Sequence, residues 1–160
     1  MEQLHPLLRP IVVSLIAGSI CWILGRKASW ITQVFALLVT VLTFSLCAKI
    51  WSLGPMSWQS VTPWLSMEGV DLQIALKVTS FTGLLSLSAT AFTFLIILFS
   101  FGYKGSVSNT GKYYAYVLWS LGAAIGAFFA NDFIFLLFCW EFLTLMLYLL
   151  INLGREDNAP

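Results

Sequence analysis

Charged residues are scarce in this sequence. Asp, Glu, Lys and Arg make up 9% of the 160 residues, and 59% are hydrophobic. A soluble domain carries about 25% charged residues, so this chain could not cover its surface in water. The composition therefore predicts an integral membrane protein that contacts the lipid bilayer. The net charge of +1 gives no basis for a nucleic-acid partner.

The side chains that soluble enzymes use are also missing. The single histidine, His5, precedes the first apolar segment, and there are no paired carboxylates, nucleophile elbow or Gly-rich phosphate loop. The three cysteines lie inside apolar runs without metal-ligand spacing: Cys21, Cys47 and Cys139. We interpret them as small buried hydrophobic residues and expect no metal site.

The sequence consists mainly of long apolar runs. They divide it into five candidate spans, at residues 11–24, 30–49, 78–101, 113–130 and 133–153. Most are near the ~20 residues that a helix needs to cross the hydrocarbon core. The first is short enough for a signal-peptide core, but Arg26 and Lys27 follow it and no convincing cleavage site appears. We expect an all-α, polytopic transmembrane bundle that forms one domain over residues 1–160.

Residues 51–77 form the one long segment between spans. Its tryptophans suit a membrane interface: Trp51, Trp58 and Trp64. Near its end, apolar residues alternate with more polar ones over 70–77, which predicts a short strand with one buried face: Val70, Leu72, Ile74 and Leu76.

The basic residues between spans predict the orientation. Five fall on one side: Arg26, Lys27, Lys104, Lys112 and Arg155. Three fall on the other: Arg9, Lys49 and Lys77. Because basic residues favour the cytoplasmic side, we expect the N-terminus outside and the C-terminus in the cytoplasm or matrix.

A single carboxylate, Glu141, stands within the apolar run FLLFCWEFLTLMLYLLI at 135–151. A charge at the centre of a membrane helix costs about 2.5–3.5 kcal/mol, so it persists only when it is paired, hydrated or used. At about 100° per residue, Thr144, Tyr148 and Asn152 share its helix face. We interpret these four residues as a candidate proton-translocation stripe. The alternative for Thr144 and Tyr148 is hydrogen bonding to neighbouring helices.

No lysine or arginine within the spans is an obvious partner for Glu141. The partner must come from another chain, or Glu141 is protonated. Asn131 or Asp132 is expected to cap the helix that carries Glu141. Gly122 and Gly126, four residues apart, predict a close packing face that holds this helix in place.

Residues 78–101 carry a stripe of hydroxyl side chains that falls within about 80° of arc: Thr79, Thr82, Ser86, Thr90, Thr93 and Ser100. Such a row can solvate a proton path, but we favour the interpretation that it joins helices by hydrogen bonds of modest strength.

Several short motifs between residues 98 and 151 resemble one family. They are Ser-Phe-Gly-Tyr at 100–103, Gly-Lys-Tyr-Tyr at 111–114, Ala-Asn-Asp at 130–132, Trp-Glu at 140–141 and Tyr-Leu-Leu-Ile at 148–151. The segment is similar to the N-terminal part of the antiporter-like subunits of respiratory complex I. Large subunits of multisubunit Na⁺/H⁺ antiporters and of membrane-bound hydrogenases belong to the same family.

The resemblance implies that Glu141 corresponds to a glutamate essential for ion translocation, which pairs with a lysine on a later helix. It implies no cofactor within this chain, because other subunits hold the redox centres. It also implies other membrane subunits as partners, in a bacterial cytoplasmic membrane or an organelle inner membrane. Whether the driving reaction is NADH-dependent, hydrogenase-like or cation exchange stays open.

Two departures leave alternatives open. The family usually has an acidic Asp-x-Leu-Ser motif where residues 79–82 read Thr-Ser-Phe-Thr, and its subunits have about fourteen helices where five are predicted here. The chain is therefore a fragment or split subunit, or a non-conducting scaffold. A small proton-coupled exporter is a weaker alternative, because such exporters carry their glutamate in the first span.

Overall fold

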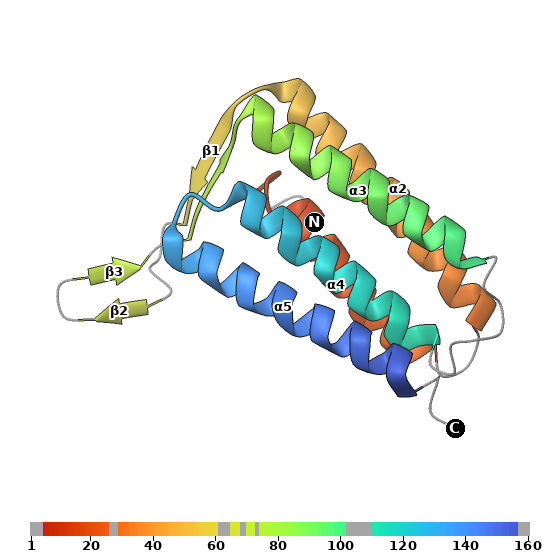
Figure 1. The fold of residues 1–160 in the computed structure, drawn as a ribbon. Helices are drawn as coiled ribbons and strands as arrows, with labels where there is room; N and C mark the ends of the chain where they lie inside the picture. Colours follow the sequence, from red (N-terminus) through yellow and green to blue (C-terminus); the bar gives the residue numbers. More distant parts are fainter. Residues whose placement is uncertain are drawn as a thin grey trace.

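The computed structural model describes residues 5–25, 29–60, 65–67, 70–72, 74–101 and 110–156. Five helices are found there (Figure 1): α1 (Arg9–Leu24), α2 (Ser29–Leu53), α3 (Ser80–Ser100), α4 (Thr110–Phe129) and α5 (Phe133–Glu156). They confirm the predicted helical bundle, and each predicted span falls on one helix. Several residues used above lie outside the described residues: Arg26, Lys27, Trp64, Gly102, Tyr103 and Lys104.

Three of the described helices are long and apolar enough to cross a membrane. The qualifying segments are Trp30–Leu53 in α2, Ser80–Ser100 in α3 and Phe133–Gly154 in α5. The helix Arg9–Leu24 is apolar but shorter. That α1 and α4 also cross the membrane remains a prediction.

Helix α4 occupies the middle of the bundle and contacts all four other helices. Figure 1 shows α2 and α3 side by side on one flank of α4, with α5 on the opposite flank. Helix α1 packs along α4 and also contacts α2. This arrangement leaves α5 with α4 as its main helical neighbour among the described residues.

The buried apolar residues form two clusters along the bundle. The first gathers at the end where α1 begins and α4 ends: Leu7, Ile11, Cys47, Ile50, Leu76, Val78, Leu121, Ile125 and Phe129. The second lies toward the other end: Ala17, Cys21, Ala36, Val39, Ile97, Tyr114, Ala115, Val117 and Leu118. Many members are small, which permits the close helix packing on which association in lipid depends.

Residues 51–78, the hairpin region, contain two short antiparallel strand pairs, one nested in sequence inside the other. Strand β1 (Met56–Gln59) pairs with β4 (Ala75–Val78), and β2 (Leu65–Met67) pairs with β3 (Val70–Leu72). The single strand predicted over residues 70–77 is therefore corrected to two strands, because β3 pairs with β2 whereas β4 pairs with β1. The predicted alternation holds within β4, where Leu76 and Val78 are buried and Lys77 is exposed.

Strand β4 also fixes the connection between α4 and α5. Leu76 forms an isolated antiparallel bridge with Ala130, and the main-chain N–H of Asn131 donates to the Ala75 carbonyl at 2.9 Å. The turn from α4 into α5 is thus tied to the hairpin at this end of the bundle.

Candidate proton-translocation site on α5

A capping hydrogen bond defines where α5 begins. The main-chain N–H of Phe135 donates to the Asp132 carboxylate at 3.3 Å, which satisfies one free amide of the first turn. Of the two predicted caps, Asp132 is the one that makes this contact. Glu141 follows Phe133 by eight residues, so it lies about 12 Å along the helix at 1.5 Å per residue.

Only one side of α5 is covered. Its buried side chains include Met146 and Leu153, which are 3% and 5% exposed. At about 100° per residue, these two point about 120–140° away from Glu141. Glu141, Thr144 and Tyr148 are exposed, and Asn152 is half-buried. The predicted stripe therefore lies on the outer face of the chain, away from its buried side.

The four stripe residues are aligned but make no hydrogen bonds to one another in the described part of the chain. The Thr144 hydroxyl donates to the Trp140 carbonyl one turn earlier, at 3.0 Å. The Thr144 hydroxyl therefore bonds within α5, whereas the alternative given above was a hydrogen bond to a neighbouring helix. Glu141 has neither a hydrogen bond nor an ion pair among the described residues.

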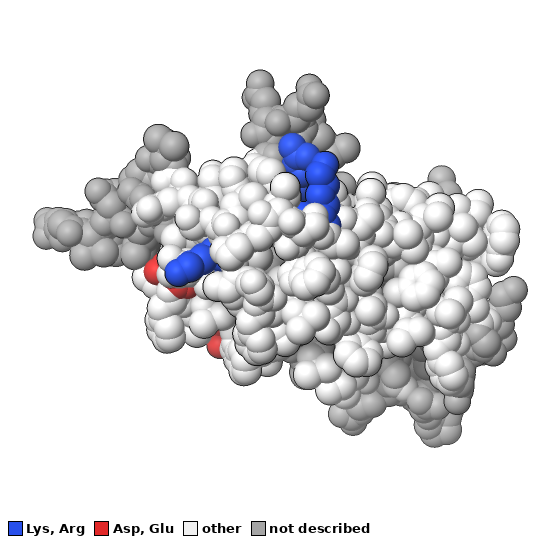
Figure 2. Space-filling view, turned by 90° about the horizontal axis from the view of Figure 1, so that it is seen from above, with Lys and Arg blue, Asp and Glu red and all other residues white. Residues whose placement is uncertain are grey.

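Large apolar side chains surround Glu141 on this face. They are about half exposed or more: Leu137, Phe138, Trp140, Leu145 and Tyr148. On the face of the molecule seen in Figure 2, Lys, Arg, Asp and Glu likewise occupy only a few spots among uncharged residues. An unpartnered carboxylate on such a face would meet lipid tails, which solvate charge poorly.

The two glycines of α4 contact different helices. A side chain at Gly126 would meet the Cys139 sulfur of α5 at 2.9 Å. One at Gly122 would meet Ser14 and the Ile11 carbonyl of α1, at 3.2 and 3.3 Å. The small-residue face therefore brings α4 close to α1 as well as to α5, the helix that the sequence predicted as its neighbour.

The hydroxyl stripe of α3 faces the interior of the bundle. Ser86 and Thr90 are fully buried, and their hydroxyls donate to carbonyls three or four residues earlier. At the far end of the stripe, the Ser100 hydroxyl forms a hydrogen bond with the Tyr114 hydroxyl of α4. The stripe is therefore mostly satisfied by its own helix, and its contribution to joining helices is limited to a few contacts.

Helix α2 has a matching polar face that was not predicted from the sequence. Its buried members are Thr32, Gln33, Thr40 and Thr43. Buried residues of α2 recur at positions 32, 36, 40, 43, 47 and 50. This helical spacing is the signal in the sequence that predicts one buried face. Within the described structure, the Gln33 Oε1 atom is buried and lacks a hydrogen-bond partner.

Taken together, the helical bundle and the outward-facing glutamate define a polytopic membrane subunit whose polar stripe is exposed to whatever packs on α5. The comparisons with known proteins point to the same class. The chain is 30% identical to NADH-quinone oxidoreductase subunit M of Buchnera aphidicola, over 95% of this chain and 32% of the relative. It is 29% identical to subunit M of Escherichia coli K12, over 89% of this chain and 30% of the relative.

Antiporters appear among the relatives too. The chain is 31% identical to Na⁺/H⁺ antiporter subunit A1 of Staphylococcus haemolyticus, over 60% of this chain and 12% of the relative. No protein-family model matches the chain. These relatives confirm the predicted resemblance to antiporter-like membrane subunits. The chain spans about a third of the length of the subunit M relatives.

The fold also has a counterpart among solved structures. One chain in the structure of the membrane-bound sulfane sulfur reductase, an archaeal respiratory membrane complex, superposes with a TM-score of 0.69. The match covers 91% of this chain and 22% of the other, at 20% identity. At this identity the comparison establishes a shared fold.

Proposed function

We propose that the chain is a membrane subunit of a complex I-like or antiporter-like ion-translocating assembly, in which Glu141 carries a proton. The observation behind this proposal is the position of Glu141 on the outer face of α5, without a partner among the described residues. The similarity to subunit M and to antiporter subunit A1 supports the same assignment.

The physical argument starts from the cost of an isolated charge in lipid. Removing a carboxylate from water favours its protonated form, whereas a nearby cation favours the ionised form. A carboxyl group placed between these influences exchanges a proton when the cation moves. Glu141 can therefore relay a proton only if a partner brings a positive charge to the exposed face of α5.

We further propose that this partner is a lysine on a helix that packs over the Glu141 stripe. The apolar side chains around Glu141 would then be buried between helices, and Thr144 and Tyr148 would lie inside the interface. Cross-linking from a photoreactive residue at Leu145, one turn after Glu141, tests this arrangement in the purified complex. Capture of a membrane helix containing lysine supports it, and labelling of lipid alone contradicts it.

Ion translocation itself is tested with Glu141→Gln, which keeps the size of the side chain and removes its ability to ionise. The complex containing this variant is reconstituted in proteoliposomes, and proton uptake is followed with a pH-sensitive dye. We expect coupled pumping to fall at least tenfold while the subunit composition stays unchanged.

Two further variants separate the carboxyl group from packing. Glu141→Asp keeps the titrating group, and we expect it to retain part of the pumping. Leu145→Ala removes apolar contact from the same face without changing charge, and we expect pumping to continue if the complex assembles. Normal pumping by Glu141→Gln would sink the proposal and favour a non-conducting scaffold.

We also propose that the N-terminus lies outside and the C-terminus in the cytoplasm or matrix. Lys77 is exposed in β4, in the hairpin region that this orientation places outside. A cysteine at position 77 should react with a membrane-impermeant thiol reagent added to intact cells. Reaction only after the cells are opened would reverse the assignment.

A further inference from the structure

Helices α1 and α4 approach closely at the end where α1 stops and α4 starts. Gly25 follows α1, and a side chain there would collide with the backbone of Gly111. About two helical turns further along α4, the indole N–H of Trp119 donates to the Leu15 carbonyl of α1 at 2.9 Å. These contacts fix the Trp119 ring against α1, beside Gly18.

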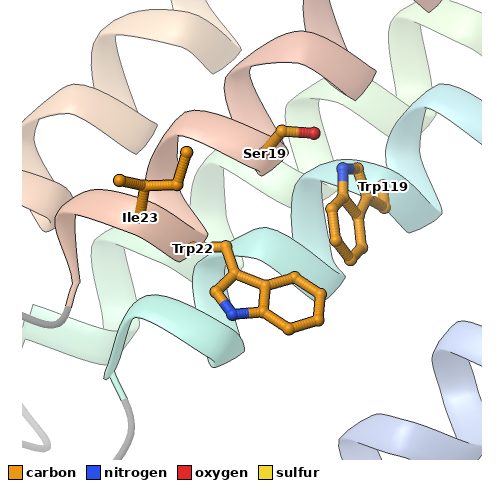
Figure 3. A pocket seen from close by; sticks show the side chains of 4 residues that line it. All are labelled: Ser19, Trp22, Ile23 and Trp119. Carbon is orange, nitrogen blue, oxygen red and sulfur yellow. The ribbon is translucent and has the colours of Figure 1, made fainter.

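A cavity of about 350 Å³ opens beside this ring. Its walls are Ser19, Trp22, Ile23 and Trp119 (Figure 3). Ile23 is 72% exposed and Trp22 is 41% exposed, so the cavity faces the outside of the bundle. This volume lies within the roughly 300–1,000 Å³ typical of small-ligand pockets.

The cavity wall presents mainly apolar surface. The Ser19 hydroxyl and the Trp119 N–H both donate to the Leu15 carbonyl, at 3.1 and 2.9 Å. Figure 3 shows the nitrogen-bearing edge of the Trp22 ring turned away from Trp119. Since the donors of Ser19 and Trp119 are already used, the chemistry of the wall selects an apolar chain.

A cation stands on the same face of α4. Lys112 precedes Tyr116 by four residues and Trp119 by seven, which places all three on one side of the helix. The Tyr116 ring lies 6.2 Å from the Trp22 ring and 6.1 Å from the Trp119 ring, measured between centroids. The aromatic cluster therefore extends from the cavity toward Lys112.

Lys112 lacks a compensating negative charge among the described residues. It makes no ion pair there, and the first turn of α4 contains no acidic residue. A cation in the first turn of a helix also faces the positive end of the helix dipole, which is unfavourable. An external anion beside Lys112 would neutralise its charge and offset the unfavourable interaction with the helix dipole.

We infer that the α1–α4 cavity binds an anionic phospholipid, with one acyl chain against Trp22 and Trp119 and the phosphate group near Lys112. Both halves of such a molecule match the site, because Trp119 of the apolar wall and Lys112 lie on the same side of α4, with the buried Tyr116 ring between them. Tryptophan and tyrosine commonly occupy this boundary between acyl chains and head groups. The inference requires that the bundle lie in a membrane, and it is independent of proton transfer by Glu141.

Photolabelling of the purified membrane complex in nanodiscs tests the inference. The probe is phosphatidylglycerol with a diazirine in its acyl chain, and the labelled peptides are identified by mass spectrometry. We expect labelling at residues 19–23 and 119, with competition by unlabelled phosphatidylglycerol and much weaker competition by phosphatidylcholine. Lys112→Gln should weaken the competition by phosphatidylglycerol about fivefold, which corresponds to about 1 kcal/mol for one lysine near anionic lipid.

Two variants serve as controls for this experiment. Lys49→Gln removes a cation elsewhere, exposed near the end of α2, and should leave the labelling unchanged. Ser19→Phe fills the cavity and should remove labelling at both helices while circular dichroism shows an intact fold. Equal competition by the two lipids, or unchanged competition in Lys112→Gln, would overturn the inference in favour of unselective lipid contact. Cross-linking of another subunit to residues 19–23 would overturn it in favour of a protein interface.

Discussion

The carboxylate of Asp132 accepts the main-chain N–H of Phe135, and this bond fixes the first turn of α5. The adjacent residue, Asn131, is tied through its own N–H to the carbonyl of Ala75 in the hairpin. The depth of Glu141 along α5 is therefore set from the hairpin end of the bundle.

Removing this cap should destabilise α5. We expect Asp132→Ala to lower the free energy of unfolding by about 1 kcal/mol, because one amide of the first turn loses its partner. Unfolding in a mixed detergent series, followed by circular dichroism, measures the change. Asn131→Ala is the matched control, since Asn131 bonds to Ala75 through its main chain. Equal losses in both variants would contradict the assignment of the cap.

Helix α3 begins with a reciprocal cap between Thr79 and Thr82. The Thr82 N–H donates to the Thr79 hydroxyl at 3.2 Å, and the Thr79 N–H donates to the Thr82 hydroxyl at 2.9 Å. We expect Thr79→Ala to cost about 1 kcal/mol in unfolding free energy, and Thr79→Asp to cost much less because aspartate also caps helices. Thermal unfolding of the two variants distinguishes these outcomes. A stable Thr79→Ala protein would show that the cap contributes little.

The contact between Gly25 and Gly111 should tolerate no larger residue. A side chain at Gly111 would meet the Gly25 backbone and the Cys21 carbonyl, so Gly111→Ala should lower stability by about 1–3 kcal/mol through overpacking. The control is Gly154→Ala in α5, where no atom lies within 4 Å of the added carbon. That substitution should be neutral or stabilising by up to about 1 kcal/mol, because alanine favours helix. Similar losses at the two positions would argue against the close contact of α1 and α4.

The N-terminal segment should loosen at acid pH. Burial, with a smaller contribution from the charge of Arg9, lowers the pKa of His5 below its usual value. The His5 ring stacks on Trp58 at 5.5 Å, and its Nδ1 accepts the Leu7 N–H at 3.4 Å, which requires a neutral ring nitrogen.

Because the folded state binds this proton less tightly than the unfolded state, His5 contributes its full stability above the usual pKa of about 6.5. That contribution declines as pH falls through the lowered pKa. Unfolding free energies measured between neutral and acid pH should show this loss, and His5→Gln should reduce it. An identical pH dependence in His5→Gln would assign the effect to other groups.

The positions of the helices along the chain were largely predictable from the sequence, because the apolar runs are long and separated by polar or aromatic segments. Asp132 was also predictable as a cap, since it directly precedes the apolar run. The pairing of β3 with β2 could not be predicted, because alternation across residues 70–77 does not reveal where one strand ends and the next begins. Tertiary contacts with β1 decided that outcome.

The alignment of the stripe on α5 follows from helical spacing alone, but its exposure does not. Periodicity places Thr144 and Tyr148 on the same face as Glu141, and only packing shows which face meets α4. Met146 supplies that information, because it is buried on the side away from Glu141. The α1–α4 cavity could not be predicted either, since it depends on the hydrogen bond from Trp119 of α4 to the Leu15 carbonyl of α1.

Infrared difference spectroscopy of the complex provides the most direct test of proton transfer by Glu141. Spectra recorded with and without turnover report carboxyl groups that gain or lose a proton. We predict a carboxyl band that disappears in Glu141→Gln and persists in Asp132→Asn, a control that removes the carboxylate at the start of α5. Identical difference spectra for the wild type and Glu141→Gln would contradict a proton-carrying role for Glu141.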